Sequence, residues 1–140
     1  MKKPRILLAE DKEDVRVAYQ KGLESRGFEV APAVSVSEAL RLISTEHFDV
    51  LLSDLHMPDA SDGFTVVDAM RHAQPNAVTL VLSNYPVLQA AMTAILLQAD
   101  QVLVKPIGFG EIAEIIHKKL SNPSAHFAMS KERCSTVVVE

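Results

Sequence analysis

Three acids, a hydroxyl and a lysine each stand at the end of a short apolar run in this sequence. They are Glu10 and Asp11 after residues 6–9, Asp54 after residues 50–52, Ser83 after residues 77–82, and Lys105 after residues 102–104. Clustered carboxylates can hold a divalent cation, one of them can act as a nucleophile, and a hydroxyl and a lysine can contact phosphoryl oxygens. Brought together, the five side chains would support phosphoryl transfer to an aspartate.

The apolar runs have the character of buried strands. Residues 50–52 are β-prone and do not alternate with polar residues, which is typical of a strand covered on both faces. Pro58 then prevents the strand from continuing. Strands are expected at residues 5–10, 28–33, 50–54, 77–83 and 101–105, and helices at 12–26, 35–45, 64–73, 87–98 and 110–120. Asp59, Asp62 and Gly63 are expected in a loop.

Regular alternation of strands and helices predicts an α/β fold with parallel strands joined by right-handed crossovers. For five strands the common arrangement is the flavodoxin-like doubly wound sheet, in the order 2-1-3-4-5 with five helices. Strands one and three are then neighbours, and ligands bind outside the carboxyl ends of the strands. We therefore expect Glu10, Asp11 and Asp54 to converge.

Three neighbouring carboxylates repel one another unless a proton or a cation intervenes. Magnesium is favoured over calcium because no loop of repeated acids is present, and over zinc because the five histidines lack paired ligand spacing. Plainer interpretations stay open for each residue alone. Glu10 and Asp11 could be a solvated helix start, and Asp54 could be a turn former.

Composition limits the class of protein. The chain has 140 residues, of which 48% are hydrophobic and 23% charged, so one domain at residues 1–120 with a linker or tail at 121–140 is expected. A net charge of −4 gives no field for holding nucleic acid or an anionic membrane. The single cysteine, Cys134, fits a reducing cytoplasm, where we expect the protein to work.

The arrangement of these residues resembles the signature of the receiver domain of two-component response regulators. The resemblance covers residues 4 to about 120 and includes the Asp54-x-x-Met57-Pro58 run with Gly63 beyond it, and Lys105-Pro106. It implies that Asp54 accepts a phosphoryl group from a sensor histidine kinase or phosphotransfer protein. Catalysis would be limited to self-dephosphorylation.

The resemblance also implies roles for the other residues. Glu10, Asp11, Asp54 and the backbone carbonyl of His56 would hold Mg²⁺. Ser83 and Lys105 would contact the phosphoryl group. The Lys105–Pro106 peptide bond is expected to be cis.

Several positions depart from the family pattern. Val102 stands where an aromatic residue usually reports phosphorylation, and Asn84 stands where Ala or Gly is usual. His56 and Tyr85 lie two residues beyond Asp54 and Ser83, where side chains tune dephosphorylation. Either ring could equally be an exposed loop residue.

Residues 87–98 contain no charged side chain. Leu88, Ala91 and Ile95 follow helical spacing, and with Val102 they map onto the family's signalling face, formed by the fourth helix, fifth strand and fifth helix. This face is expected to bind a partner or a second copy of the chain. A deeply buried fourth helix would give the same pattern, so both interpretations stay open.

Three other functions compete with a phosphorylated receiver. A pseudo-receiver acting only through protein contacts would fit Val102 and Asn84, although the retained acids and Lys105 oppose it. A haloacid dehalogenase-like phosphatase usually carries a second acid where this chain has His56. A cofactor-binding flavodoxin-like protein would need a glycine-rich loop after the first strand, which the sequence lacks.

Overall fold

The computed structural model describes residues 2–55, 60–83 and 99–121. Within these ranges the chain forms five strands and four helices. The strands are β1 (Arg5–Ala9), β2 (Glu29–Ala33), β3 (Val50–Asp54), β4 (Val78–Ser83) and β5 (Gln101–Val104). The helices are α1 (Glu13–Glu24), α2 (Val36–Thr45), α3 (Ala60–Ala73) and α5 (Phe109–Ser121). None of these helices has the length and apolar character needed to cross a membrane.

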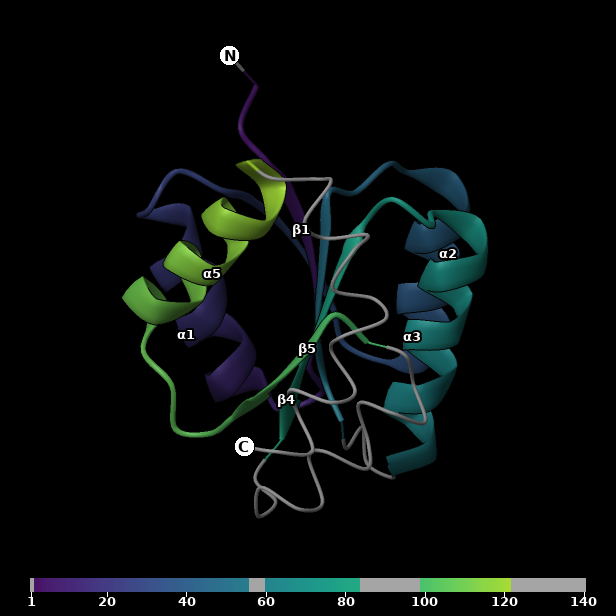
Figure 1. The fold of residues 1–140 in the computed structure, drawn as a ribbon. Helices are drawn as coiled ribbons and strands as arrows, with labels where there is room; N and C mark the ends of the chain where they lie inside the picture. The colour runs from purple at the N-terminus through teal and green to yellow at the C-terminus, as the bar shows by residue number, and fades with distance from the viewer. Residues whose placement is uncertain (1, 56–59, 84–98, 122–140) are drawn as a thin grey trace, which may run out of the picture.

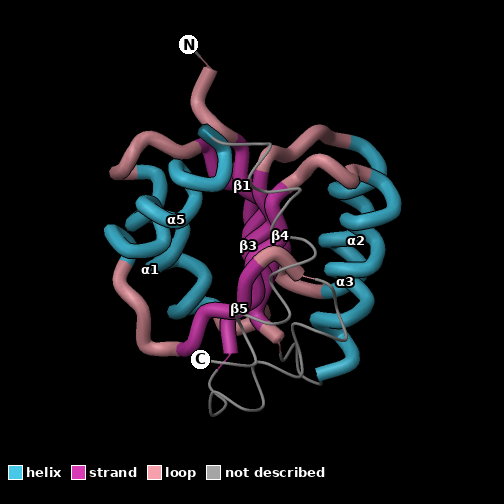
Figure 2. The backbone as a smooth tube through the Cα atoms, in the orientation of Figure 1, coloured by secondary structure: helices cyan, strands magenta, loops and turns pink. Residues whose placement is uncertain are grey.

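The strands form one parallel sheet in the order β2-β1-β3-β4-β5, which confirms the predicted topology. Helices α1 and α5 cover one face of the sheet, and α2 and α3 cover the other (Figure 1). The tube view shows the same two helical layers on either side of the strands (Figure 2). The helix predicted at residues 87–98 lies outside the described residues.

Both faces of the central strands are buried, as the lack of alternation in β3 indicates. One core cluster includes Leu7 and Leu51 with Met70 of α3. The other includes Leu8 and Leu52 and lies beneath α1 and α5. Burying each large aliphatic side chain stabilises the fold by roughly 1.5–3 kcal/mol, so the central strands are held firmly in place.

Helix α3 begins earlier than the sequence analysis predicts. Asp62 and Gly63 were expected in a loop, but the helix starts at Ala60 and includes both. The Gly63 amide donates a hydrogen bond to the Leu55 carbonyl at 3.2 Å. A Cβ atom at Gly63 would lie 2.6 Å from the same oxygen. Glycine therefore allows α3 to pack directly against the chain that leaves β3.

Local features of the sequence fix the ends of two helices. Gly27 follows α1 with a φ of 93°, a conformation that glycine adopts readily. At the start of α2, the Ser35 hydroxyl accepts a hydrogen bond from the Glu38 amide at 3.2 Å. The Glu38 carboxylate bonds to the Val34 amide at 2.9 Å, one residue before the partner that a standard capping box uses.

Buried polar side chains hold the chain near the amino ends of the strands. Asp100 is 1% exposed, and its carboxylate accepts hydrogen bonds from the Thr79 amide at 2.6 Å and hydroxyl at 3.1 Å. The Gln74 amide bonds to the backbone of Phe48 at 2.8 Å and to two carbonyls near the end of α2. Sequence analysis missed both residues, because their partners are at least 21 positions away.

The close approach at Gly63 makes a prediction about stability. We expect Gly63→Ala to lower the free energy of unfolding by about 1–3 kcal/mol, because the methyl group must displace backbone. Gly110→Ala is a matched control, since its Cβ would come no closer than 3.6 Å to the Arg26 side chain. That helical change should raise stability by about 0.5–1 kcal/mol. Urea denaturation of both variants checks this, and equal effects would contradict it.

Candidate functional site

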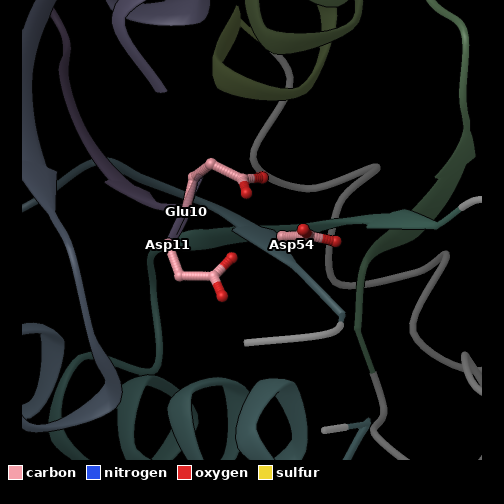
Figure 3. A group of neighbouring side chains, drawn as sticks. All are labelled: Glu10, Asp11 and Asp54. Atoms are coloured by element: carbon pink, nitrogen blue, oxygen red, sulfur yellow. The ribbon is translucent and has the colours of Figure 1, made fainter. Parts of the chain in front are cut away.

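Three carboxylates meet at the carboxyl ends of β1 and β3. Glu10 and Asp11 follow β1, and Asp54 is the last residue of β3. The two strands are paired in register, with Ala9 opposite Ser53. One oxygen from each carboxylate lies within 4.8 Å of the other two. Figure 3 shows the three side chains lying close to one another, as the sequence predicts.

Lys105 brings a positive charge into this cluster. Its ammonium nitrogen lies 3.5 Å from Asp54 Oδ2 and 3.7 Å from Glu10 Oε2. The side chain is only 14% exposed, so water screens these attractions weakly. The Lys105 amide donates a hydrogen bond to the Ser83 carbonyl at 2.8 Å, which places the lysine directly after the sheet. The Lys105–Pro106 peptide bond is cis, as expected.

Ser83 ends β4 and is fully buried. The residue before it, Leu82, pairs with Asp54, so Ser83 lies at the same edge of the sheet as the acids. The structure therefore brings Glu10, Asp11, Asp54, Ser83 and Lys105 to one edge. Val102 is also among the described residues. The remaining predicted site residues lie outside them, and they are His56, Asn84, Tyr85, Leu88, Ala91 and Ile95.

Val102 lies on β5 opposite Val81 of β4. It is partly buried against the core cluster that includes Val81 and Ala99. Two residues further along the same strand, Val104 is 39% exposed. At Val102, this chain thus has a short aliphatic side chain where the family that the sequence resembles usually has an aromatic one.

Burial and the neighbouring carboxylate change the pKa of Glu10. Glu10 is 1% exposed, and burial first, then its hydrogen bond with Asp54, raises the pKa of Glu10 to about 7. A hydrogen bond from the Lys12 amide at 3.1 Å and the charge of Lys105 oppose this rise in pKa. Two adjacent buried carboxylates resist carrying two negative charges, so a proton or a cation stabilises the pair.

The oxygen atoms of the site suit a hard divalent cation. Glu10 Oε2 and Asp11 Oδ1 are buried, and neither has a hydrogen-bond partner in the described parts of the chain. Carboxylate oxygens are the ligands that Mg²⁺ and Ca²⁺ prefer. A buried oxygen without a donor is costly, and coordination would remove that cost. The acidic cluster therefore has the chemistry of a metal-binding site.

Arg16 supports the acidic turn, a role that sequence analysis missed. Its Nη1 lies 3.2 Å from the backbone oxygen of Glu10 and 3.5 Å from that of Asp11. A guanidinium can hold two carbonyls because its donors have a fixed geometry. Only its place early in the predicted first helix could have suggested this, since the helix begins beside both acids.

Comparison with known proteins identifies the family. The family model for the response regulator receiver domain matches residues 6–117. The chain belongs to this family. It is a signalling domain of the kind found in two-component systems, and its five-stranded sheet has the order that the sequence predicts.

Relatives of this receiver domain include larger regulators and solved structures. The transcriptional regulatory protein PrrA of Mycobacterium tuberculosis is 33% identical over 92% of this chain, which spans 55% of PrrA. The chain thus spans about half the length of this curated relative.

Two solved structures that share this fold contain bound ligands. A Burkholderia pseudomallei response regulator with a phosphorylated aspartic acid, calcium ion and citrate has a TM-score of 0.74 and 30% identity. That alignment covers 90% of this chain and 74% of the other. Thermotoga maritima TrrA in complex with Mg²⁺ and BeF has a TM-score of 0.71 and 26% identity, covering 82% and 97%.

The raised pKa of Glu10 predicts how stability depends on pH. An acid whose pKa rises on folding, here from 4.5 to about 7, stabilises the fold below pH 4.5, and this contribution disappears as pH rises through 7. Without divalent cations, we expect the wild type to lose on the order of 1–3 kcal/mol relative to Glu10→Gln between about pH 5 and pH 8. Urea denaturation of both proteins measures it. A constant difference across this pH range would contradict the prediction.

Proposed function

We propose that this receiver domain accepts a phosphoryl group on Asp54 from the phosphohistidine of a sensor histidine kinase or phosphotransfer protein. The reaction would depend on Mg²⁺, and the signal would pass to an output domain or a partner protein in the cytoplasm. The observation that supports this most is the position of Asp54, which lies within the acidic cluster and 3.5 Å from the Lys105 ammonium.

The proposed reaction is a displacement at phosphorus. A carboxylate oxygen of Asp54 attacks, the bond between phosphorus and the histidine nitrogen breaks, and the electron pair returns to the imidazole. Lys105 and Ser83 stabilise the phosphoryl oxygens, whose charge is greatest during transfer. Because Lys105 is already drawn towards Asp54, little rearrangement is needed before the reaction.

The proposed cofactor is Mg²⁺, held by Glu10, Asp11, Asp54 and the backbone carbonyl of His56. When bound, it would offset the negative charge shared by the acids and the incoming phosphoryl oxygens. Magnesium keeps several waters and needs few protein carboxylates, which suits a three-acid cluster. The complex of TrrA with Mg²⁺ and BeF supports the same assignment by similarity.

The domain would act as a switch whose only reaction is at its own aspartate. Slow hydrolysis of the aspartyl phosphate would reset it. His56, Asn84 and Tyr85 are proposed to set the rate of this hydrolysis, because they follow Asp54 and Ser83 closely in the sequence.

Phosphorylation by a small donor tests the proposal. With acetyl phosphate and Mg²⁺, intact-mass spectrometry should show one added phosphoryl group on the wild type. Asp54→Asn and wild type with EDTA should show none. Lys105→Ala should be labelled roughly 100-fold more slowly, as expected when a charge-stabilising donor is removed. An unlabelled wild type would instead favour a pseudo-receiver, and phosphate release much faster than this slow reset would favour a phosphatase.

We also propose that the face formed by the fourth helix, β5 and α5 binds a second copy of the chain. In the described part of this face, β5 is an edge strand and Val104 is 39% exposed. Val104→Glu should weaken self-association of the phosphorylated domain by at least about 10-fold, because a charge would be buried at the interface. Sedimentation velocity measures this. If association is unchanged by Val104→Glu, the proposed face is wrong.

A further inference from the structure

Helix α1 carries a glycine where it faces the start of α5. Gly22 lies in the interior of α1, where glycine is less favourable than alanine. A Cβ atom at this position would lie 2.5 Å from two ring atoms of Phe109. The missing side chain thus creates a notch in the helix, and the Phe109 ring fills it.

The same ring is held on a second side by Tyr19, one turn earlier in α1. The two ring centroids are 5.3 Å apart, and the rings are nearly perpendicular at 86°. This edge-to-face geometry is favourable for aromatic pairs. Tyr19 is 8% exposed and belongs to the core cluster beneath α1 and α5, while Phe109 packs against that cluster.

The two helices that meet at this junction both follow residues of the functional site in the chain. Phe109 is the first residue of α5 and follows Lys105 by four positions. Helix α1 begins at Glu13, two positions after Asp11. Burial, and then the charges of Glu10 and Asp54, raise the pKa of the Tyr19 hydroxyl, so Tyr19 lies within the electric field of the acidic cluster.

We propose that Phe109 is a positioning residue, and that Gly22 and Tyr19 form the socket that holds it. By fixing the end of the 105–109 segment on α1, the ring keeps the Lys105 ammonium beside Asp54. Lys105 has a long side chain with four rotatable bonds, and its backbone is tied to the sheet by the hydrogen bond that its amide donates to the Ser83 carbonyl. A second anchor four residues later restricts where the chain between them can go.

The test compares Phe109→Leu with Phe28→Leu. Phe28 is 1% exposed, belongs to the same core cluster, and stacks on His117 further along α5 at a centroid distance of 5.0 Å. Both changes replace a ring by an aliphatic side chain. One ring belongs to α5, and the other packs against it. Only Phe109 is close to Lys105 in the chain, so the pair separates positioning from general loss of packing.

The first readout is amide hydrogen exchange, which does not depend on phosphorylation. Phe109→Leu should speed exchange of the Lys105 amide at least about 10-fold relative to Phe28→Leu, measured under conditions of equal global stability. Amides of β1 should exchange alike in the two variants. Equal exchange at Lys105 would overturn the proposal, whether or not the domain accepts phosphate.

The second readout rests on the proposed function and uses the rate of labelling by acetyl phosphate with Mg²⁺. Phe109→Leu should slow labelling roughly 10-fold, because a displaced catalytic group loses much of its effect. Phe28→Leu should leave the rate unchanged. In a Lys105→Ala background, Phe109→Leu should have no further effect, since the two changes act through the same group. Additive effects would overturn the inference.

Gly22→Ala gives a third, reciprocal check. Alone, its methyl group should displace the Phe109 ring and speed Lys105 amide exchange. Combined with Phe109→Leu, the smaller side chain leaves room for the methyl group, so the double variant should exchange more slowly than either single variant. If Gly22→Ala leaves exchange unchanged, the notch does not hold the ring and the proposal fails.

Discussion

The repulsion among Glu10, Asp11 and Asp54 is the constraint on which the rest of this structure depends. Their oxygens lie within 4.8 Å of one another, and Glu10 and Asp54 are almost completely buried. Such a cluster is unfavourable unless something offsets its charge. In this structure the Lys105 ammonium and the raised pKa of Glu10 do so. A bound cation would offset the negative charge that remains, together with that of an incoming phosphoryl group.

The sheet holds these charges together because the carboxyl ends and the amino ends of its strands differ in their polar contacts. At the carboxyl ends of the strands, one carboxylate oxygen of Glu10 and one of Asp11 have no hydrogen-bond partner among the described residues. At the amino ends, Asp100 and Gln74 have their polar atoms bonded to backbone groups of neighbouring elements. Satisfied hydrogen bonds stabilise the amino ends of the strands, and close packing on both faces keeps the whole sheet rigid. Residues remote from the site therefore offset the unfavourable free energy of its clustered charges.

Tertiary contacts, which no local pattern shows, explain where the sequence was not enough. The early start of α3 depends on Gly63 lying against the Leu55 backbone, a contact that helix propensity cannot reveal. Arg16 looks like any exposed helical residue until its guanidinium is seen beside the carbonyls of Glu10 and Asp11. In the sequence, Gly22 suggests only a weak position in a helix. Its packing role is not visible there, because its partner Phe109 lies 87 residues later.

The sequence alone determined the order of strands and helices, the parallel sheet and the five residues at its carboxyl edge. It could do so because apolar runs set the strands, and a polar residue after a buried strand must lie at its end. Only the tertiary structure decided how those residues meet: which oxygens lack donors, how near Lys105 lies to Asp54, and which ring anchors the following helix. Those properties depend on distances between elements, and distances follow from side-chain packing rather than from periodicity.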